Sequence, residues 1–133
     1  MDVERVNPPG LYPGAPYHYA TVVGPGELVF AAGACPIDES GEVVDGPDIA
    51  LQTARAVNNL LAALREAGAG VEDVLKTTVY VVATSQDELV RAWSVVEAAF
   101  GDARPPSTLL GVPVLGYTGQ LVEIEAVAVR RRD

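Results

Sequence analysis

The sequence predicts an α+β domain, in which a mixed sheet of about five to six strands carries two helices on one face. Three observations favour this class. The segments follow in the order strand, strand, helix, strand, helix, strand, strand; several strands are apolar on both faces; and each helix has one apolar stripe. At 133 residues the chain is long enough for one well-formed core, so we expect a single domain spanning residues 1–133.

The N-terminal part is expected to be irregular and then extended. Residues 1–16 are rich in Pro and Gly, which predicts an irregular arm. A first strand is predicted over 17–23. A second strand is predicted over 28–35, where apolar residues on both faces indicate burial on both sides of the sheet. Residues 36–47 are expected to form a loop or small hairpin around Ser40-Gly41.

Two helices carry clear start and stop signals. Asp48 is expected to cap the first helix and Gly68 to end it in a left-handed conformation. Ser85 with Glu88 forms a capping-box pattern for the second helix, which Gly101 closes. The predicted buried stripes are Ala50, Ala54, Val57, Leu61 and Leu64 in the first helix, and Leu89, Ala92, Trp93, Val96 and Phe100 in the second.

Three further strands are predicted, over 76–83, 107–112 and 121–129. Along the last strand, alternation places Val122, Ile124, Ala126 and Ala128 on one face, and Glu123, Glu125, Val127 and Val129 on the other. Two carboxylates on an otherwise apolar face are costly to bury without partners. This conflict makes the strand the best chemical clue in the chain.

The predicted sheet has more apolar surface than two helices can cover. We expect Val29, Val79 or Tyr80, Val127 and Val129 on the uncovered face. An apolar area of this kind is seldom left in water, so it indicates an oligomer that packs sheet against sheet.

Composition and charge exclude several classes. The formal net charge of −9 argues against a nucleic-acid partner, and the one basic cluster, residues 130–132, is expected to be a solvated tail. The single cysteine excludes an intrachain disulfide and fits a reducing compartment. The acidic, Pro-rich start is not a signal peptide and no apolar run reaches the length of a membrane span. We expect a cytoplasmic protein without membrane contact, and no metal cluster or cofactor motif is present in the sequence.

Four segments together carry a family resemblance: Ala15-Pro16-Tyr17, Phe30-Ala31-Ala32-Gly33, residues 76–81 (KTTVYV) and residues 121–128 (LVEIEAVA). From about residue 15 to residue 131 the chain resembles the RidA/YjgF family. The resemblance implies a chorismate-mutase-like fold and a homotrimer with sheets inside and helices outside. It also implies small-molecule clefts between subunits. Characterised members of that family hydrolyse 2-imino acids to 2-keto acids and ammonia.

The resemblance also implies a set of site residues. The family's Tyr and Glu fall on Tyr17 and Glu123, with Glu123 as the catalytic residue that positions or activates water. The family's strand Ser, helix Asn and carboxylate-binding Arg fall on Ala32, Trp93 and Ser107. The expected substrate-binding set is therefore Tyr17, Gly33, Trp93, Ser107 and Tyr117.

The loss of the family Arg has the largest expected effect. A serine hydroxyl cannot replace a bidentate guanidinium–carboxylate contact. Removing one partner of such a desolvated pair costs roughly 3–5 kcal/mol, or about a hundred- to thousandfold in affinity. Arg104 lies three residues before Ser107, and an odd offset in a strand points a side chain to the opposite face, which argues against a rescue.

Several residues keep two interpretations at this point. His18 is expected at the surface or at a cleft rim. Cys35 is interpreted as a small buried hydrophobe, with a reactive thiol as the alternative. Trp93 either packs in the core or lines the cleft, and Tyr117 either overhangs the cleft or is an exposed turn residue. Glu125 is expected to flank water at the trimer axis rather than to act in the site.

Three classes of function remain open from the sequence. The first is an imine- or enamine-type hydrolase, weak on simple 2-imino acids. The second is a non-catalytic small-molecule-binding trimer, either a sensor or a ligand carrier. The third is a ribonuclease or translation inhibitor, against which the net charge of −9 weighs.

Overall fold

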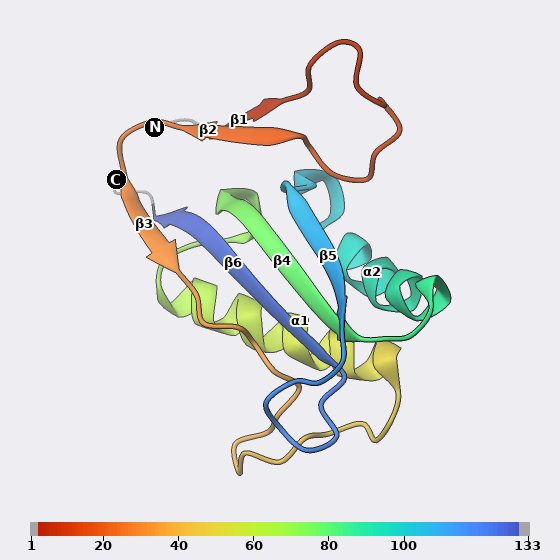
Figure 1. The fold of residues 1–133 in the computed structure, drawn as a ribbon. Coiled ribbons are helices and arrows are strands. Elements are labelled where there is room, and N and C mark those ends of the chain that lie inside the picture. The colour runs from red at the N-terminus through yellow and green to blue at the C-terminus, as the bar shows by residue number, and fades with distance from the viewer. Residues whose placement is uncertain (1–2, 131–133) are drawn as a thin grey trace.

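A mixed four-stranded sheet with two helices on one face forms the body of the protein (Figure 1). The computed structural model describes residues 3–130. The sheet order is β3-β6-β4-β5, with β4 and β5 parallel and β6 antiparallel to both of its neighbours. The predicted class, a mixed sheet covered by two helices, is confirmed. The elements of this body are β3 (Glu27–Phe30), α1 (Ile49–Glu66), β4 (Val74–Val82), α2 (Gln86–Phe100), β5 (Ser107–Val112) and β6 (Val122–Arg130).

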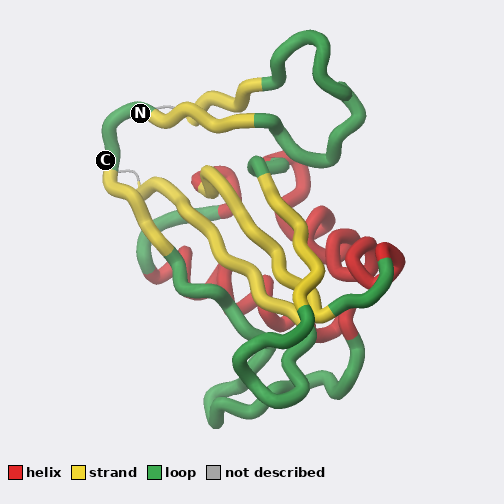
Figure 2. The backbone as a smooth tube through the Cα atoms, viewed as in Figure 1, coloured by secondary structure: helices red, strands yellow, loops and turns green. Residues whose placement is uncertain are grey.

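A separate hairpin lies at the N-terminus, where an irregular arm was predicted. Strand β1 (Val3–Val6) pairs antiparallel with β2 (Ala20–Val23), and the long loop between them stands out from the body (Figure 2). Of the predicted arm over residues 1–16, the segment Val3–Val6 is therefore a strand. The first predicted strand, 17–23, begins only at Ala20. The six strands of residues 3–130 thus divide into sheets of two and four.

Strand β3 is shorter than the predicted segment 28–35. Regular pairing ends at Phe30, and Ala34 then rejoins the sheet through a single bridge to Ile124. The expected burial of both faces is not met within one chain, because Leu28 is 53% exposed and Phe30 is 73% exposed. Two large apolar side chains on β3 are left without a cover.

Helix α1 begins and ends where the sequence predicted. Asp48 Oδ1 accepts a hydrogen bond of 2.9 Å from the amide of Leu51, and Gly68 adopts a φ of +90° just beyond the helix. The buried stripe is rotated from the predicted one, since Ala50, Ala54 and Leu61 are only half-buried. The observed buried face of α1 includes two polar residues, Gln52 and Thr53. The buried residues of α1 are Ile49, Gln52, Thr53, Ala56, Val57, Leu60 and Leu64.

The N-terminus of helix α2 has a variant of the predicted capping box. The hydroxyl of Ser85 accepts a hydrogen bond from the amide of Glu88, as expected. The carboxylate of Glu88 accepts from the amide of Thr84, one residue before the cap. Gly101 ends the helix with a φ of +54°. Of the predicted stripe, Ala92, Val96 and Phe100 are buried, while Leu89 and Trp93 pack at the edge of the core.

The alternation predicted for β6 is present. Its apolar residues Val122, Ile124, Ala126 and Ala128 face the helices and belong to the core. Val29 packs on this helix side, because it pairs in register with Ala128, so its expected place on the uncovered face is wrong. Of the alternatives Val79 and Tyr80, Val79 pairs with Ile124 on the helix side and Tyr80 pairs with Glu123 on the opposite face. The opposite face, called the outer face below, carries Leu28, Phe30, Tyr80, Leu110, Glu123, Glu125, Val127 and Val129. Val129 is nevertheless buried within the single chain.

No helix within residues 3–130 is both long enough and apolar enough to cross a bilayer.

Candidate functional site

A cavity on the helix side of the sheet brings three of the predicted site residues together. It has a volume of about 330 Å³ and is lined by Tyr17, Trp93 and Ser107, with Pro16 and Leu109. Trp93 comes from α2, Ser107 begins β5, and Tyr17 lies in the loop before β2. The indole packs against the core and also lines the cavity, so both interpretations of Trp93 hold. We call this space the Trp93 cavity.

The hydroxyl of Ser107 is already engaged within the chain. Thr77 Oγ1 donates a hydrogen bond of 2.7 Å to Ser107 Oγ, and Thr77 is only 1% exposed. The two residues pair in register on the parallel strands β4 and β5. Ser107 therefore points to the helix side with Thr77, which fixes the side of the sheet on which the Trp93 cavity lies.

Arg104 lies beside this cavity, contrary to the strand-based expectation that it would face away. It has a φ of +42°, so the chain turns at this residue and strand parity does not apply. With Trp93 and Ser107 it borders a second cavity of about 10 Å³, room for one water at most. Its Nη2 donates a hydrogen bond of 2.6 Å to the carbonyl oxygen of Ala15. The guanidinium thereby ties the N-terminal loop to the start of β5.

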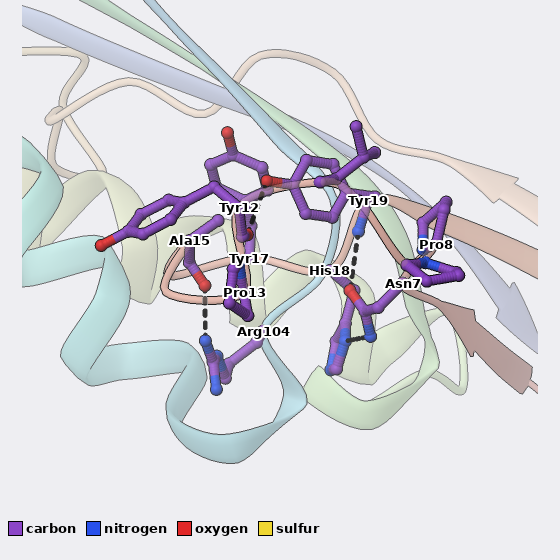
Figure 3. A pocket seen from close by; sticks show the side chains of 12 residues that line it. Asn7, Pro8, Tyr12, Pro13, Ala15, Tyr17, His18, Tyr19 and Arg104 are labelled. Atoms are coloured by element: carbon purple, nitrogen blue, oxygen red, sulfur yellow. Dashed lines mark hydrogen bonds between the residues drawn. The ribbon is translucent and has the colours of Figure 1, made fainter.

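The N-terminal loop lines a wider hollow of about 690 Å³, which shares Tyr17 with the Trp93 cavity (Figure 3). The rings of Tyr17 and Tyr19 meet edge to face, with centroids 5.6 Å apart. The side-chain amide of Asn7 lies 2.8 Å from Nδ1 of His18. Burial, and then the nearby charges of Arg5 and Arg104, lower the pKa of His18. As expected, His18 is a rim residue.

Glu123 lies on the outer face, in a different environment. Its Oε1 accepts hydrogen bonds from Cys35 Sγ at 3.3 Å and from Gln120 Nε2 at 3.2 Å. Its side chain occupies the space that a Cβ on Gly33 would need. The backbone amide of Tyr117 donates to Gln120 Oε1, which links Tyr117 to Glu123, while the Tyr117 side chain is 46% exposed in the loop before β6. Gly33, Glu123 and Tyr117 therefore form a second group, which we call the Glu123 cluster.

The thiol of Cys35 departs from its predicted role as a small buried hydrophobe. It is half-buried and donates to a carboxylate. Burial, and then its hydrogen bond with Glu123, raise the pKa of Cys35 to about 11. The thiol is therefore protonated at neutral pH and remains a donor. Neither Cys35 nor Gln120 was among the predicted site residues.

The sheet separates the Trp93 cavity from the Glu123 cluster. Ser107 pairs with Thr77, which pairs with Ala126 of β6, and all three are on the helix side. Glu123 is on the outer face, three residues from Ala126 and two strands from β5. Three residues along a strand and two strands across a sheet each correspond to about 10 Å. The Trp93 cavity and the Glu123 cluster are therefore separated by about that distance in both directions. One chain does not bring its predicted site residues to one place.

Metal chemistry has no obvious donors here. Across residues 3–130, the His, Cys, Asp and Glu side chains form no group of three that could hold a metal ion.

Comparison with known proteins gives one consistent result. A protein-family model described as Endoribonuclease L-PSP matches residues 11–130. The chain is 39% identical over 119 residues to a RutC family protein of Pyrococcus abyssi, covering 89% of each. It is 32% identical over 123 residues to the 2-iminobutanoate/2-iminopropanoate deaminase of Escherichia coli, covering 90% of this chain and 92% of that protein.

A solved structure agrees with these matches. The chain resembles a Rid-family protein of unknown function, YyfB from Yersinia pestis, with a TM-score of 0.89 and 32% identity. The match covers 97% of this chain and 99% of that one.

Proposed function

The chain belongs to the RidA/YjgF family, and we propose that it is an imine- or enamine-type hydrolase with sites between the subunits of a homotrimer. Its substrates differ from simple 2-imino acids, because Ser107 stands where the family has a carboxylate-binding Arg. The name of the Escherichia coli relative, a 2-iminobutanoate/2-iminopropanoate deaminase, supports the type of reaction.

The observation that carries the proposal is the position of Glu123 on the face opposite the Trp93 cavity. Two donors fix the Glu123 carboxylate on the outer face, and Glu123 does not line the Trp93 cavity of its own chain. A second subunit packed on that face supplies one, with its own Tyr17, Trp93 and Ser107 at the edge strand β5. Each site then combines the Glu123 cluster of one subunit with the Trp93 cavity of the next.

The apolar outer face supports such an assembly. Leu28, Phe30 and Leu110 are 53%, 73% and 43% exposed in the single chain. Burying large side chains of this kind stabilises an interface by about 1.5–3 kcal/mol each. Three copies around an axis bury all of these faces at once, and closed symmetry is the usual solution for soluble homo-oligomers.

The reaction requires little from the protein beyond a base and a closed cleft. Glu123 takes a proton from water while the water oxygen bonds to the C=N carbon, and the π electrons move to nitrogen. Nitrogen receives the proton from Glu123, giving a carbinolamine. Glu123 then takes the hydroxyl proton of the carbinolamine and returns it to nitrogen, the C=O bond forms as the C–N bond breaks, and ammonia leaves. The balance is R₂C=NH + H₂O → R₂C=O + NH₃.

Ser107 and Trp93 set the substrate range. Ser107 offers one hydroxyl, which already accepts from Thr77, so a substrate carboxylate finds no cation at this position. Arg104 is the nearest guanidinium, but it has to leave the carbonyl of Ala15 before it can bind a carboxylate. The indole of Trp93 and the ring of Tyr17 favour an apolar or aromatic substrate body.

A coupled assay tests the proposal. Ammonia release from 2-iminopropionate and 2-iminobutyrate is followed in the wild type, in Ser107→Arg and in Glu123→Gln. We expect weak turnover in the wild type, a gain of about a hundredfold in kcat/KM for Ser107→Arg, and loss of turnover in Glu123→Gln. If Glu123→Gln is as active as the wild type, the proposed chemistry is wrong. Wild-type turnover equal to that of an Arg-bearing relative would show that Arg104 binds the carboxylate.

A non-catalytic binding protein is the second candidate, because three polar family positions are occupied by Ala32, Trp93 and Ser107. In that case a ligand stabilises the trimer without any release of ammonia from imines. A ribonuclease, the activity in the description of the family model, is disfavoured by the net charge of −9.

A further inference from the structure

The two oxygens of Glu123 have different surroundings. Oε1 accepts from Cys35 Sγ at 3.3 Å and from Gln120 Nε2 at 3.2 Å. Oε2 is the atom nearest to the position where Gly33 would carry a Cβ. One oxygen is therefore held by donors, and the other lies on the side where no side chain intervenes.

Backbone pairing places Cys35 beside Glu123. Ala34 and Ile124 exchange two backbone hydrogen bonds of 2.7 and 3.1 Å, and both side chains contribute to the core. Because side chains alternate along extended chain, the neighbours Gly33 and Cys35 lie on the outer face with Glu123. The isolated bridge thus sets the thiol on one side of the carboxylate and the glycine on the other.

The orientation of the Gln120 amide is also fixed. Its Oε1 accepts from the amide of Tyr117 at 3.0 Å, so its Nε2 has to face the other way. Nε2 donates to the carbonyl of Val122 and to Glu123 Oε1. Gln120 is 3% exposed, so water does not compete for these bonds.

We propose that Cys35 and Gln120 are positioning residues, which hold Glu123 Oε1 so that Oε2 acts as the base in the proposed hydrolysis. This inference rests on the proposed function. The thiol suits the role, because it is neutral and adds no positive charge that would weaken the base. Sγ also lies 3.6 Å from the carbonyl of Gly33, but the contact with the charged oxygen is shorter and stronger.

Two donors on Oε1 fix the orientation of the carboxylate. Removing the Cys35 donor leaves only the Gln120 amide on that oxygen and loosens the orientation of Glu123. The looser base lowers kcat with little change in KM, since Cys35 does not contact the substrate.

A thiol titration tests the contact without any substrate. Cys35 is the only cysteine, but the five tyrosines also absorb near 240 nm when ionised, so the thiolate signal is taken as the difference in absorbance between each protein and its Cys35→Ala counterpart. In the wild-type trimer we expect a thiol pKa of about 11, which falls toward the ordinary value of 9.0 in Glu123→Gln. Equal titration in the two proteins overturns the contact, and the positioning role with it.

Steady-state kinetics of Cys35 variants test the positioning role. Against an imine that the wild type hydrolyses, Cys35→Ala is expected to lose about tenfold in kcat at unchanged KM. Cys35→Ser keeps a donor and is expected to recover most of that loss. A Cys35→Ala enzyme with the wild-type kcat overturns the positioning role and leaves the proposed function intact. A wild type inactive on every imine tested overturns the proposed function and the role, whereas the titration still reports the contact.

Discussion

Tyr80 on β4 donates a hydrogen bond of 2.6 Å to Glu125 Oε1 on β6, so one of the two carboxylates on the outer face has a tyrosine partner within its own chain. Glu123, two residues earlier, has instead a thiol and an amide on one oxygen. The two glutamates share a strand face but have different partners. This difference supports a structural role for Glu125 and a chemical one for Glu123.

The first prediction concerns the Tyr80–Glu125 bond and its pH dependence. The hydrogen bond that Tyr80 donates to Glu125 raises the pKa of Tyr80 above its ordinary value of 10.0. A raised folded-state pKa contributes stability that is present below pH 10.0 and is lost as pH rises through the folded-state pKa. Tyr80→Phe should therefore lower the free energy of unfolding by about 0.5 kcal/mol at neutral pH, a small value because the pair is partly exposed.

Denaturant unfolding at neutral and alkaline pH checks this prediction. The difference between the wild type and Tyr80→Phe should disappear at strongly alkaline pH. A difference that stays constant into alkaline solution would mean that the phenol stabilises by packing alone.

The second prediction concerns assembly through the outer face. Phe30 is 73% exposed in the single chain, so Phe30→Asp costs the isolated fold little. In a trimer with sheets inside, it places an unpaired charge in each interface. We expect Phe30→Asp to dissociate the assembly into monomers or to remove soluble protein.

Val114→Asp is the matched control, because Val114 is equally exposed but lies in the loop after β5. Light scattering at micromolar concentration should give a trimer for the wild type and for Val114→Asp. A wild type that is a stable, folded monomer would refute the proposed assembly.

The third prediction uses the close approach of Gly33 to Glu123. A methyl group on residue 33 would overlap the Glu123 side chain as far back as Cγ, so the carboxylate has to move away. Gly33→Ala should keep the fold, abolish imine turnover, and bring the thiol pKa of Cys35 toward 9.0 as its partner leaves. Gly116→Ala is the control for the substitution itself, because a Cβ there meets nothing within 4 Å.

Thiol titration and the imine assay, run on Gly33→Ala and on Gly116→Ala, test this prediction. If Gly33→Ala retains full turnover, the observed position of Glu123 is not the catalytic one.

Elements with local signals were predictable from the sequence. The Asp48 cap and the left-handed Gly68 bound α1 correctly because each acts within a turn of its own position. The alternation of β6 likewise follows from strand geometry alone. Strand β1 was missed because Val3–Val6 is short and its partner, Ala20–Val23, lies beyond a Pro- and Gly-rich loop. Such pairing is a tertiary effect that composition does not show.

The candidate site residues could be predicted from the sequence only where a motif includes them. Gly33 and Glu123 were predicted from their segments, and the structure places them in contact. Cys35 and Gln120 were not found, since their contacts depend on the Ala34 bridge and on the return of the loop before β6. The spacing of Gly33 and Cys35, two residues apart on one strand face, was the one available signal.

The last prediction concerns the ligand that the altered cleft prefers. With Ser107 for Arg and Trp93 for Asn, the Trp93 cavity presents an aromatic face, which also attracts cations. The nearby guanidinium of Arg104 is engaged by the carbonyl of Ala15. A small carboxylate therefore has to break that contact to gain an ion pair, whereas a neutral or cationic aromatic molecule binds without doing so.

Thermal-shift measurements on the wild type should accordingly show stabilisation by neutral aromatic compounds and aromatic amines, and little by 2-keto acids. The double variant Trp93→Asn with Ser107→Arg should reverse this order, because the introduced guanidinium supplies the carboxylate contact without moving Arg104. Arg104→Ala in the wild-type background is the control, since it should leave the response to neutral aromatics in place. A wild type stabilised more by 2-keto acids than by aromatic amines would show that the cleft still selects carboxylates, with Arg104 as the residue that binds them.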